Sequence, residues 1–347
     1  MKVVVIGAGY AGTIAANRLV KKAADVEVVV VNPRADFVER VRLHEHIAGS
    51  GTALTPLTGM LDPRIRLVVG AVDKIGDGTL LLADATSLPF DRAIYAAGGA
   101  PTAPSGAYAV GTIETAESAR QALAGLSDGA AVTVVGGGLT GIETAAEVAE
   151  SLPGLRVRLL SEGEVGASLG PGARARVRRE LEKLGVVVER GRYTEDDGAD
   201  LVLWAVANQV SDLAARSGLA VDDAGRVLVD EFLRSVGDPR ILAVGDGASV
   251  PGQRLSCQTA LPQGAHGADN LARELEGTPM RAYSMGYTGQ NVSIGRRSAV
   301  IQAARRDDTP TRIRFGGRSA ALVKEQVCRM AKGAARTARY AWLPAPR

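Results

Sequence analysis

The sequence predicts an α/β fold that contains two Rossmann-like dinucleotide-binding domains. A buried strand, a glycine-rich turn and a helix follow one another at the start of the chain, and the same order returns about 130 residues later. The 347 residues are enough for about two to three domains. The 42 glycines lie in short clusters without a fixed period, which favours ligand-binding turns over a repeat architecture.

The first unit begins at the N-terminus. A buried strand is predicted at 2–6, a helix at 13–22 and a second strand at 26–31, and the sequence GAGYAG joins the first strand to the helix. In such a motif the first glycine permits a tight turn, the second lets the backbone approach a pyrophosphate, and the third lets helix and strand pack closely. The amide groups at the helix N-terminus then face the phosphates. The predicted contacts are Gly7, Gly9, Ala11 and Gly12.

The second unit repeats this order. A strand is predicted at 131–135, a helix at 142–151 and a further strand at 156–160, with the sequence GGGLTG at 136–141. A simple dehydrogenase needs one such fold, whereas two suit a flavoprotein that binds FAD in the first and NADH or NADPH in the second. The pair therefore predicts hydride transfer within the protein. The predicted nucleotide contacts here are Gly136, Gly138, Thr140 and Gly141.

The position that usually binds the ribose hydroxyls lies about 20 residues past each glycine motif, and an acidic residue is typical there. The chain has Asn32 in the first unit and Ser161 in the second. The amide of Asn32 can still hydrogen-bond a ribose. Ser161 does not repel a 2′-phosphate, and Glu162, the next residue, could take over the ribose. The choice between NADH and NADPH therefore stays open.

Cysteine and histidine are too sparse for several other kinds of site. Cys257 and Cys328 are far apart and form no C-x-x-C motif, which disfavours a disulfide framework, a four-cysteine zinc site and an iron–sulfur cluster. The only histidines are His44, His46 and His266, so a metal site is not expected. The chain shows neither a leader pattern nor a run of about 18 apolar residues, which predicts a cytoplasmic protein.

Two further motifs follow predicted strands, the sequence YAAG at 95–98 and AVGDG at 243–247. With them the chain resembles the flavoproteins with two dinucleotide-binding domains, and more closely the branch of type II NADH:quinone oxidoreductases and apoptosis-inducing-factor-like quinone reductases. The stretches 32–44, 257–266 and 292–297 are similar to bacterial members as well. The resemblance implies a discontinuous FAD domain at 1–108 plus 236–282, an NAD(P)H domain inserted at 109–235, and a C-terminal segment at 283–347.

The resemblance also implies roles for single residues. Asp246 would bind a ribityl hydroxyl, and a helix at 259–275 would direct the amides of Ala260 and Leu261 at the flavin pyrimidine edge, where the helix dipole favours the anionic reduced flavin. Glu143 would orient the nicotinamide or relay a proton as a general acid with a raised pKa, although the helix dipole alone also favours a glutamate there. Lys324 resembles a lysine close to the flavin. The remaining implied FAD contacts are Arg42, His44, Val72, Ala97, Gly98 and Gly245.

Two departures from the resemblance concern the substrates. Quinone-reducing relatives often have paired glutamines where this chain has Pro262-Gln263, and the usual A-x-G of the second domain is Ala205-Val206-Ala207. The predicted function is nonetheless that of an FAD-dependent oxidoreductase that passes hydride from NAD(P)H through the flavin to a quinone or quinone-like small molecule. The alternatives are a reductase for a ferredoxin-type carrier and a redox-sensing flavoprotein without turnover.

The C-terminal segment carries the positive charge of the chain. Residues 296–347 contain 13 Lys or Arg and 3 Asp or Glu. A helix predicted at 320–341 would place four basic residues on one face and a thin apolar stripe on another. Peripheral contact with an anionic membrane and packing against the FAD domain explain this pattern equally well, and no nucleic-acid partner is expected. The basic residues are Arg329, Lys332, Arg336 and Arg339, and the apolar residues are Val323, Val327, Met330 and Ala334.

Overall fold

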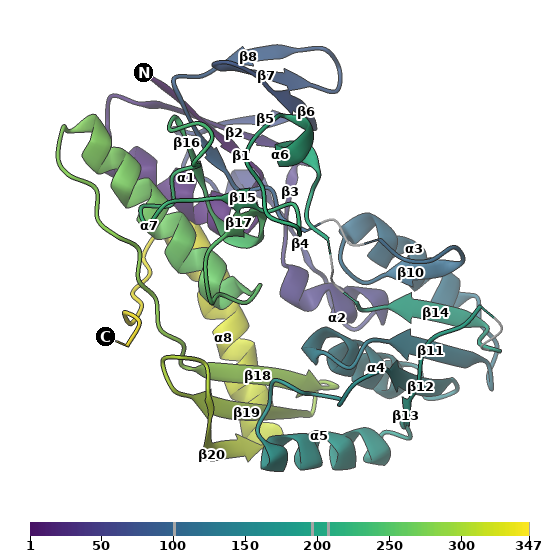
Figure 1. The fold of residues 1–347 in the computed structure, drawn as a ribbon. Helices are drawn as coiled ribbons and strands as arrows, with labels where there is room; N and C mark the ends of the chain where they lie inside the picture. The colour runs from purple at the N-terminus through teal and green to yellow at the C-terminus, as the bar shows by residue number, and fades with distance from the viewer. Residues whose placement is uncertain (100–101, 196–197, 207–208, 347) are drawn as a thin grey trace.

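A computed structural model describes residues 1–99, 102–195, 198–206 and 209–346, and two five-stranded parallel sheets form its framework (Figure 1). The first sheet has the order β16-β9-β1-β2-β5 and the second the order β10-β14-β11-β12-β13. The strands of the first are β1 (Lys2–Ile6), β2 (Glu27–Asn32), β5 (Arg66–Val69), β9 (Arg92–Tyr95) and β16 (Ile241–Ala243). Those of the second are β10 (Ala107–Ala109), β11 (Ala131–Val135), β12 (Arg156–Ser161), β13 (Val187–Arg190) and β14 (Leu201–Trp204).

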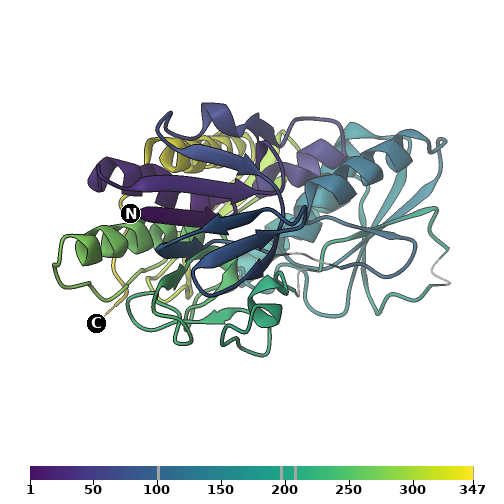
Figure 2. The same cartoon turned by 90° about the horizontal axis from the view of Figure 1, so that it is seen from above.

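The prediction of an α/β fold with two Rossmann-like units is confirmed. Since β16 joins the first sheet from residues 241–243, the second sheet interrupts the first in sequence. The predicted boundary between residues 108 and 109 falls within β10, which pairs with β14. Seen from above, the two units lie side by side (Figure 2).

Helices and small sheets surround this framework. The helices are α1 (Tyr10–Lys22), α2 (Leu43–Ile47), α3 (Ile113–Ala124), α4 (Leu139–Ser151), α5 (Pro171–Lys183), α6 (Leu213–Arg216), α7 (Cys257–Leu275) and α8 (Arg318–Thr337). The antiparallel strands are β3 (Asp36–Val38) with β4 (Leu54–Pro56), β6 (Val72–Ile75) with β7 (Thr79–Leu82) and β8 (Ser87–Pro89), and β18 (Gly289–Ile294) with β19 (Ser298–Ala304) and β20 (Pro310–Gly316). The two-residue strands β15 (Val227–Leu228) and β17 (Ala248–Ser249) pair with each other in parallel. None of the described helices is long and apolar enough to cross a bilayer.

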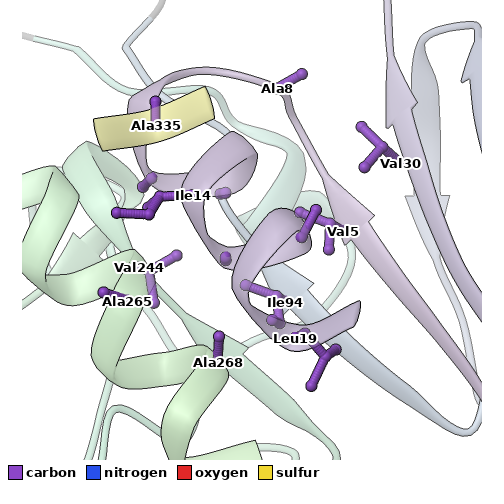
Figure 3. Close-up of a cluster of buried hydrophobic side chains, with 14 of the residues drawn as sticks. Val5, Ala8, Ile14, Leu19, Val30, Ile94, Val244, Ala265, Ala268 and Ala335 are labelled. Carbon is purple, nitrogen blue, oxygen red and sulfur yellow. The ribbon is translucent and has the colours of Figure 1, made fainter. Parts of the chain in front are cut away.

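The core of the first unit lies around α1, which packs against the sheet and against α7. Small residues allow α1 and α7 to approach closely: a side chain on Gly264 would overlap the carbonyl oxygen of Ala11. The C-terminal helix α8 completes the same core through Ala331, Ala334 and Ala335. Figure 3 labels ten of the side chains that meet there: Val5, Ala8, Ile14, Leu19, Val30, Ile94, Val244, Ala265, Ala268 and Ala335.

The faces of α8 differ from those predicted from the sequence. Lys332, assigned to an exposed basic face, donates hydrogen bonds to Glu39 (2.9 Å) and Thr55 (2.7 Å). Ala334, assigned to the apolar stripe, is buried, whereas Val323 and Met330 of that stripe are 42% and 63% exposed. The reason is that α8 lies across both the C-terminal sheet and α1 and therefore buries different residues along its length.

The third glycine of each motif is fixed by close packing between a helix and a turn. A Cβ on Gly12 would overlap the carbonyl oxygen of Gly7, and a Cβ on Gly141 would overlap that of Gly136. By contrast, a Cβ on Gly138, in the same motif as Gly141, would have no neighbour within 4 Å.

We therefore expect Gly141→Ala to destabilise the protein by the roughly 1–3 kcal/mol typical of overpacking, and Gly138→Ala to cost less than about 1 kcal/mol because alanine fits a helix start in open space. Urea unfolding of the two variants checks this. Equal losses of stability in both variants would contradict the packing role of Gly141.

Candidate functional site

Each glycine motif forms an open cradle at the start of a helix. Gly9 is the N-cap of α1 and Gly138 is the N-cap of α4, both with extended backbone and neither with a side-chain cap. A Cβ on either residue would meet nothing within 4 Å. Both helix starts thus have amides without a side-chain cap and open space beside the N-cap residue, an arrangement that suits a pyrophosphate. The residues present fit one dinucleotide in each unit.

The other predicted FAD motifs gather beside the first cradle. The Cβ position of Gly7 (φ +95°) lies 2.8 Å from the carbonyl oxygen of Ala96, and a Cβ on Gly247 would overlap the carbonyl oxygen of Ala97. Gly245 (φ +76°) donates its amide hydrogen to Gln263 Oε1 at 2.7 Å. The structure thus brings three motifs that are far apart in the sequence to the carboxyl ends of neighbouring strands. Gln263, which follows the unusual Pro262, is buried and fixes this turn.

Asp246 lies in this region and has a partner that the sequence reasoning missed. Arg40 Nη1 donates to Asp246 Oδ2 at 3.1 Å, and the same guanidinium lies 3.5 Å from the Cβ position of Gly98. Burial raises the pKa of the Asp246 carboxyl, and Arg40 opposes this rise. Arg40 lies within the stretch 32–44, where the resemblance implies a role for Arg42 only. Nothing in the spacing of the two arginines indicates which of them reaches Asp246.

Asn32 and Val72, two further predicted FAD contacts, have protein partners. Asn32 Oδ1 accepts from the amide of Ala8 at 3.0 Å, and its Nδ2 donates to the carbonyl oxygen of Arg34 at 2.7 Å. The buried side-chain amide of Asn32 therefore stabilises the glycine turn. Val72 begins β6 and pairs with Leu82 in the small antiparallel sheet.

The start of α7 corrects the predicted amide donors. The helix begins at Cys257, two residues before the predicted start, because Ser256 caps it by accepting from the amide of Thr259 at 3.3 Å. The Ala260 amide donates to the carbonyl oxygen of Ser256 at 3.0 Å, and Leu261 is buried in the first core. Ala260 therefore offers no free amide. The amides at Cys257 and Gln258, in the first turn, are among those that a helix start leaves without a partner inside the helix.

Glu143 lies where three parts of the chain meet. Its Oε1 accepts from Lys324 Nζ at 2.7 Å and from the Ser293 amide and hydroxyl at 3.0 and 3.1 Å. The three residues come from α4, α8 and β18, and the side chains of Glu143 and Lys324 are only 10% and 12% exposed. Ser293 falls in the stretch 292–297, which resembles bacterial flavoproteins. The sequence alone does not indicate its contact with Glu143, because that contact forms only where β18 packs against α4.

The pKa of Glu143 lies below its ordinary value, not above it as expected for a general acid. Burial alone raises this pKa, but the charge of Lys324, together with hydrogen bonds from Lys324 and Ser293, outweighs it and holds the pKa below its ordinary value. For Lys324, burial lowers the pKa, and the carboxylate of Glu143 reverses the effect and raises it. The proton of the pair therefore lies on Lys324 Nζ, and Glu143 is a carboxylate.

His44 extends this group of residues on the side of the first unit. Its Nε2 lies 3.3 Å from Ser293 Oγ and 3.4 Å from Arg296 Nη2. Since an arginine only donates, Nε2 is the acceptor and the ring is neutral. Burial lowers the pKa of His44 to about 4, against the opposing charge of Glu143. His44 is therefore a neutral hydrogen-bond acceptor beside Ser293.

Arg42 is held by carboxylates. It lies 3.3 Å from Glu39, 3.0 Å from Glu45 and 2.9 Å from Glu325, and its side chain is 11% exposed. These contacts raise its pKa, although burial alone lowers it. Because Glu325 lies on α8, Arg42 ties that helix to the first unit. The guanidinium of Arg42, a predicted FAD contact, thus forms ion pairs with three carboxylates of the protein.

The second cradle has one closely packed wall. The Cβ position of Gly136 (φ +125°) lies 3.0 Å from the carbonyl oxygen of Ala205 and 3.3 Å from a methyl group of Val206. Ala207, where the usual motif has glycine, lies outside the described residues. The carbonyl oxygen of Thr140 accepts from the hydroxyl of Thr144 at 2.8 Å, within α4.

Residues 1–268 match the family described as pyridine nucleotide-disulphide oxidoreductase. An NADH dehydrogenase-like protein of Mycobacterium tuberculosis is 31% identical, with 86% of this chain and 87% of that protein covered. A type II NADH:quinone oxidoreductase of the same organism, NdhA, is 28% identical, with 88% and 79% covered. The sulfide:quinone oxidoreductase of Aquifex aeolicus superposes with a TM-score of 0.80 at 16% identity, over 97% of this chain and 92% of that one. The last comparison establishes the fold alone.

We expect the neutral state of His44 to make stability depend on pH. The pKa of His44 is about 4 in the folded protein and ordinarily 6.5, so the unfolded chain takes up the proton first as the pH falls. The free energy of unfolding therefore decreases between pH 6.5 and 4, by up to about 3 kcal/mol. In His44→Gln, which keeps a hydrogen-bond acceptor, this contribution is absent. Urea unfolding across that range checks the difference, and parallel pH profiles for the two proteins would refute the assignment.

Proposed function

Because the chain belongs to the pyridine nucleotide-disulphide oxidoreductase family, we propose that it passes two electrons from NAD(P)H, by way of FAD, to a quinone. The observation that carries the proposal is the pair of open glycine cradles at Gly9 and Gly138, one in each unit, with the Glu143–Lys324 pair where the units meet. The quinone as acceptor is supported by the name of the relative NdhA.

Each cradle has a separate role in this proposal. The first, with Asp246 and the motif at 95–98, would hold the FAD, and the second would hold the nicotinamide nucleotide. The chemistry that bound FAD supplies is the uptake of two electrons as hydride and their release to an acceptor. The protein supplies position: uncapped helix amides at the phosphates and a carboxylate at Asp246 for a hydroxyl group.

The Glu143–Lys324 pair would supply a proton for reduction of the quinone. Reduction of a quinone to a quinol consumes two electrons and two protons. One proton arrives with the electron pair as hydride, and a group near the acceptor must supply the other. Lys324 Nζ carries one, and Glu143 holds it in place through the 2.7 Å contact. We therefore assign the acid role to Lys324 and a positioning role to Glu143. Of the two roles expected for Glu143 from the sequence, orienting a partner and relaying a proton, this assignment keeps the first.

The deciding experiment is anaerobic and uses the purified protein. We expect a yellow protein whose FAD absorbance bleaches with NADH or NADPH and recovers within a catalytic turnover when a soluble quinone is added. Recovery only with a ferredoxin would favour the carrier reductase. Slow recovery with every acceptor would favour a redox sensor. A colourless protein that FAD cannot reconstitute would refute the proposal.

A membrane contact of this protein would use β20 and exposed residues of α8 as far as Met330. These two elements are consecutive in the chain and pack together. Ile313, Phe315 and Leu322 are 71%, 44% and 70% exposed, and so is Met330 at 63%. The exposed arginines of the same segments are Arg312, Arg314, Arg318 and Arg329. Exposed apolar side chains and arginines in the same segments suit the surface of an anionic bilayer, where a lipid-dissolved quinone would be reached.

We expect the double variant Ile313→Ser and Leu322→Ser to pellet with anionic liposomes about tenfold less than the parent, because burial of each large apolar side chain contributes roughly 1.5–3 kcal/mol when complete. Binding of the parent should also fall as salt is added. Val236→Ser, which alters a 59% exposed valine elsewhere, is the matched control. Equal pelleting of the parent and the double variant would refute this surface.

A further inference from the structure

The outer edge of the second sheet, beside the second cradle, carries an unusual set of charges. Ser161 ends β12 and pairs in register with Arg190, which ends β13. A Cβ on Gly137 would overlap the hydroxyl of Ser161, so this edge lies directly against the glycine motif. In parallel α/β sheets, nucleotides bind at the carboxyl ends of the strands. The adenosine ribose of a nucleotide in the second cradle would therefore lie at this edge.

The residue at the usual acidic position cannot reject a 2′-phosphate. Ser161 is neutral and 8% exposed, and its hydroxyl faces the backbone of the glycine motif. An acidic residue there would select NADH, because it accepts from the ribose 2′-hydroxyl and repels a phosphate. This source of selectivity is missing from the chain.

Two arginines and one glutamate take its place. Arg190 Nε donates to the carbonyl oxygen of Glu162 at 3.2 Å, and Arg192 Nε lies 3.3 Å from Glu162 Oε1. The side chains of Arg192 and Glu162 are 83% and 68% exposed. The carboxylate of Glu162 is thus held by an arginine, and the three side chains together carry one net positive charge. The next carboxylate along, Glu164, lies 3.1 Å from Arg178.

An exposed ion pair of this kind is weak and exchanges readily with a better partner. A phosphate monoester carries about −1.5 to −2 charges at neutral pH, more than a carboxylate, and it accepts two parallel hydrogen bonds from one guanidinium. A 2′-phosphate would therefore displace Glu162 from Arg192. Arg190 lies beside Glu162 and uses Nε for its hydrogen bond to the carbonyl oxygen of that residue.

We propose that the second nucleotide site accepts NADPH at least as well as NADH, with the 2′-phosphate held by Arg190 and Arg192. In this arrangement Glu162 is the competing anion: it accepts from the ribose hydroxyls when NADH binds and turns aside when NADPH binds. The inference rests on the proposed function and specifies its electron donor. It departs from the names of the two Mycobacterium tuberculosis relatives reported above, which mention NADH and not NADPH.

The first test compares kcat/KM for NADPH and NADH with one quinone. We expect a ratio of one or more in the parent. Arg192→Gln should lower kcat/KM for NADPH at least tenfold and leave that for NADH within about twofold, and Glu162→Gln should raise the ratio. Arg120→Gln is the control, because Arg120 is exposed on α3 and is paired with Glu117 of its own helix. A parent that favours NADH tenfold or more, or an Arg192 variant that loses both nucleotides equally, would overturn the inference.

The second test measures binding without turnover. Calorimetric titration of the flavin-loaded protein with 2′,5′-ADP and with 5′-AMP isolates the contribution of the 2′-phosphate. We expect 2′,5′-ADP to bind at least tenfold tighter, and Arg192→Gln to remove most of that difference. Equal affinity for the two compounds would overturn the inference. If neither NADH nor NADPH reduced the flavin, the proposed function would fail, and this titration would still decide the phosphate site.

Discussion

The buried ion pair of Glu143 and Lys324 is the interaction on which the mutual position of the three parts depends. Glu143 belongs to the interrupting unit, Lys324 to the last helix, and Ser293, which donates to the same carboxylate oxygen, to the C-terminal sheet. Loss of one partner leaves an uncompensated charge in a water-poor place, which is far more costly than loss of an exposed pair. Any movement that separated the units would break this contact. The hydrogen bonds and charge of the Glu143 carboxylate therefore hold α4, β18 and α8 together.

The same glycine turn is used twice, and its surroundings distinguish the two copies. Both turns leave the second glycine open and press the third against a carbonyl oxygen. The first copy is completed by Asp246 and Arg40, a partly buried acid beside a basic group. The second is completed by Ser161 with an exposed glutamate and arginines. Identical backbone geometry thus presents different electrostatic environments to its ligands, which is how one motif serves two nucleotides.

Local signals predicted the framework well. The glycine motifs, the strands on each side of them and the long helix α7 depend on residues close together in the sequence, and the spacing of Gly7, Gly9 and Gly12 already contains the geometry of the turn. The partners of the site residues were not predictable in this way. Arg40 reaches Asp246 across 206 residues, and Lys332 reaches Glu39 across 293. Such contacts follow from the packing of distant elements, and no period or spacing records them. The start of α7 was missed for a smaller reason, because the cap at Ser256 lies outside the apolar pattern.

The contact between the first helix and the end of the last one has a consequence for the order of biosynthesis. The side chain of Asn17 donates to the carbonyl oxygen of Ala335, 318 residues later, and Arg18 donates to that of Ala338. The sheet beside α1 is likewise incomplete until β16 has been synthesised. On the ribosome, the unit that is synthesised first is therefore the one completed last, while the interrupting unit, whose strands lie within residues 107–204, has all its sheet partners much earlier. The N-terminal sheet lacks a strand until residue 243 has been made, and the core around α1 lacks its last helix until the chain is nearly complete.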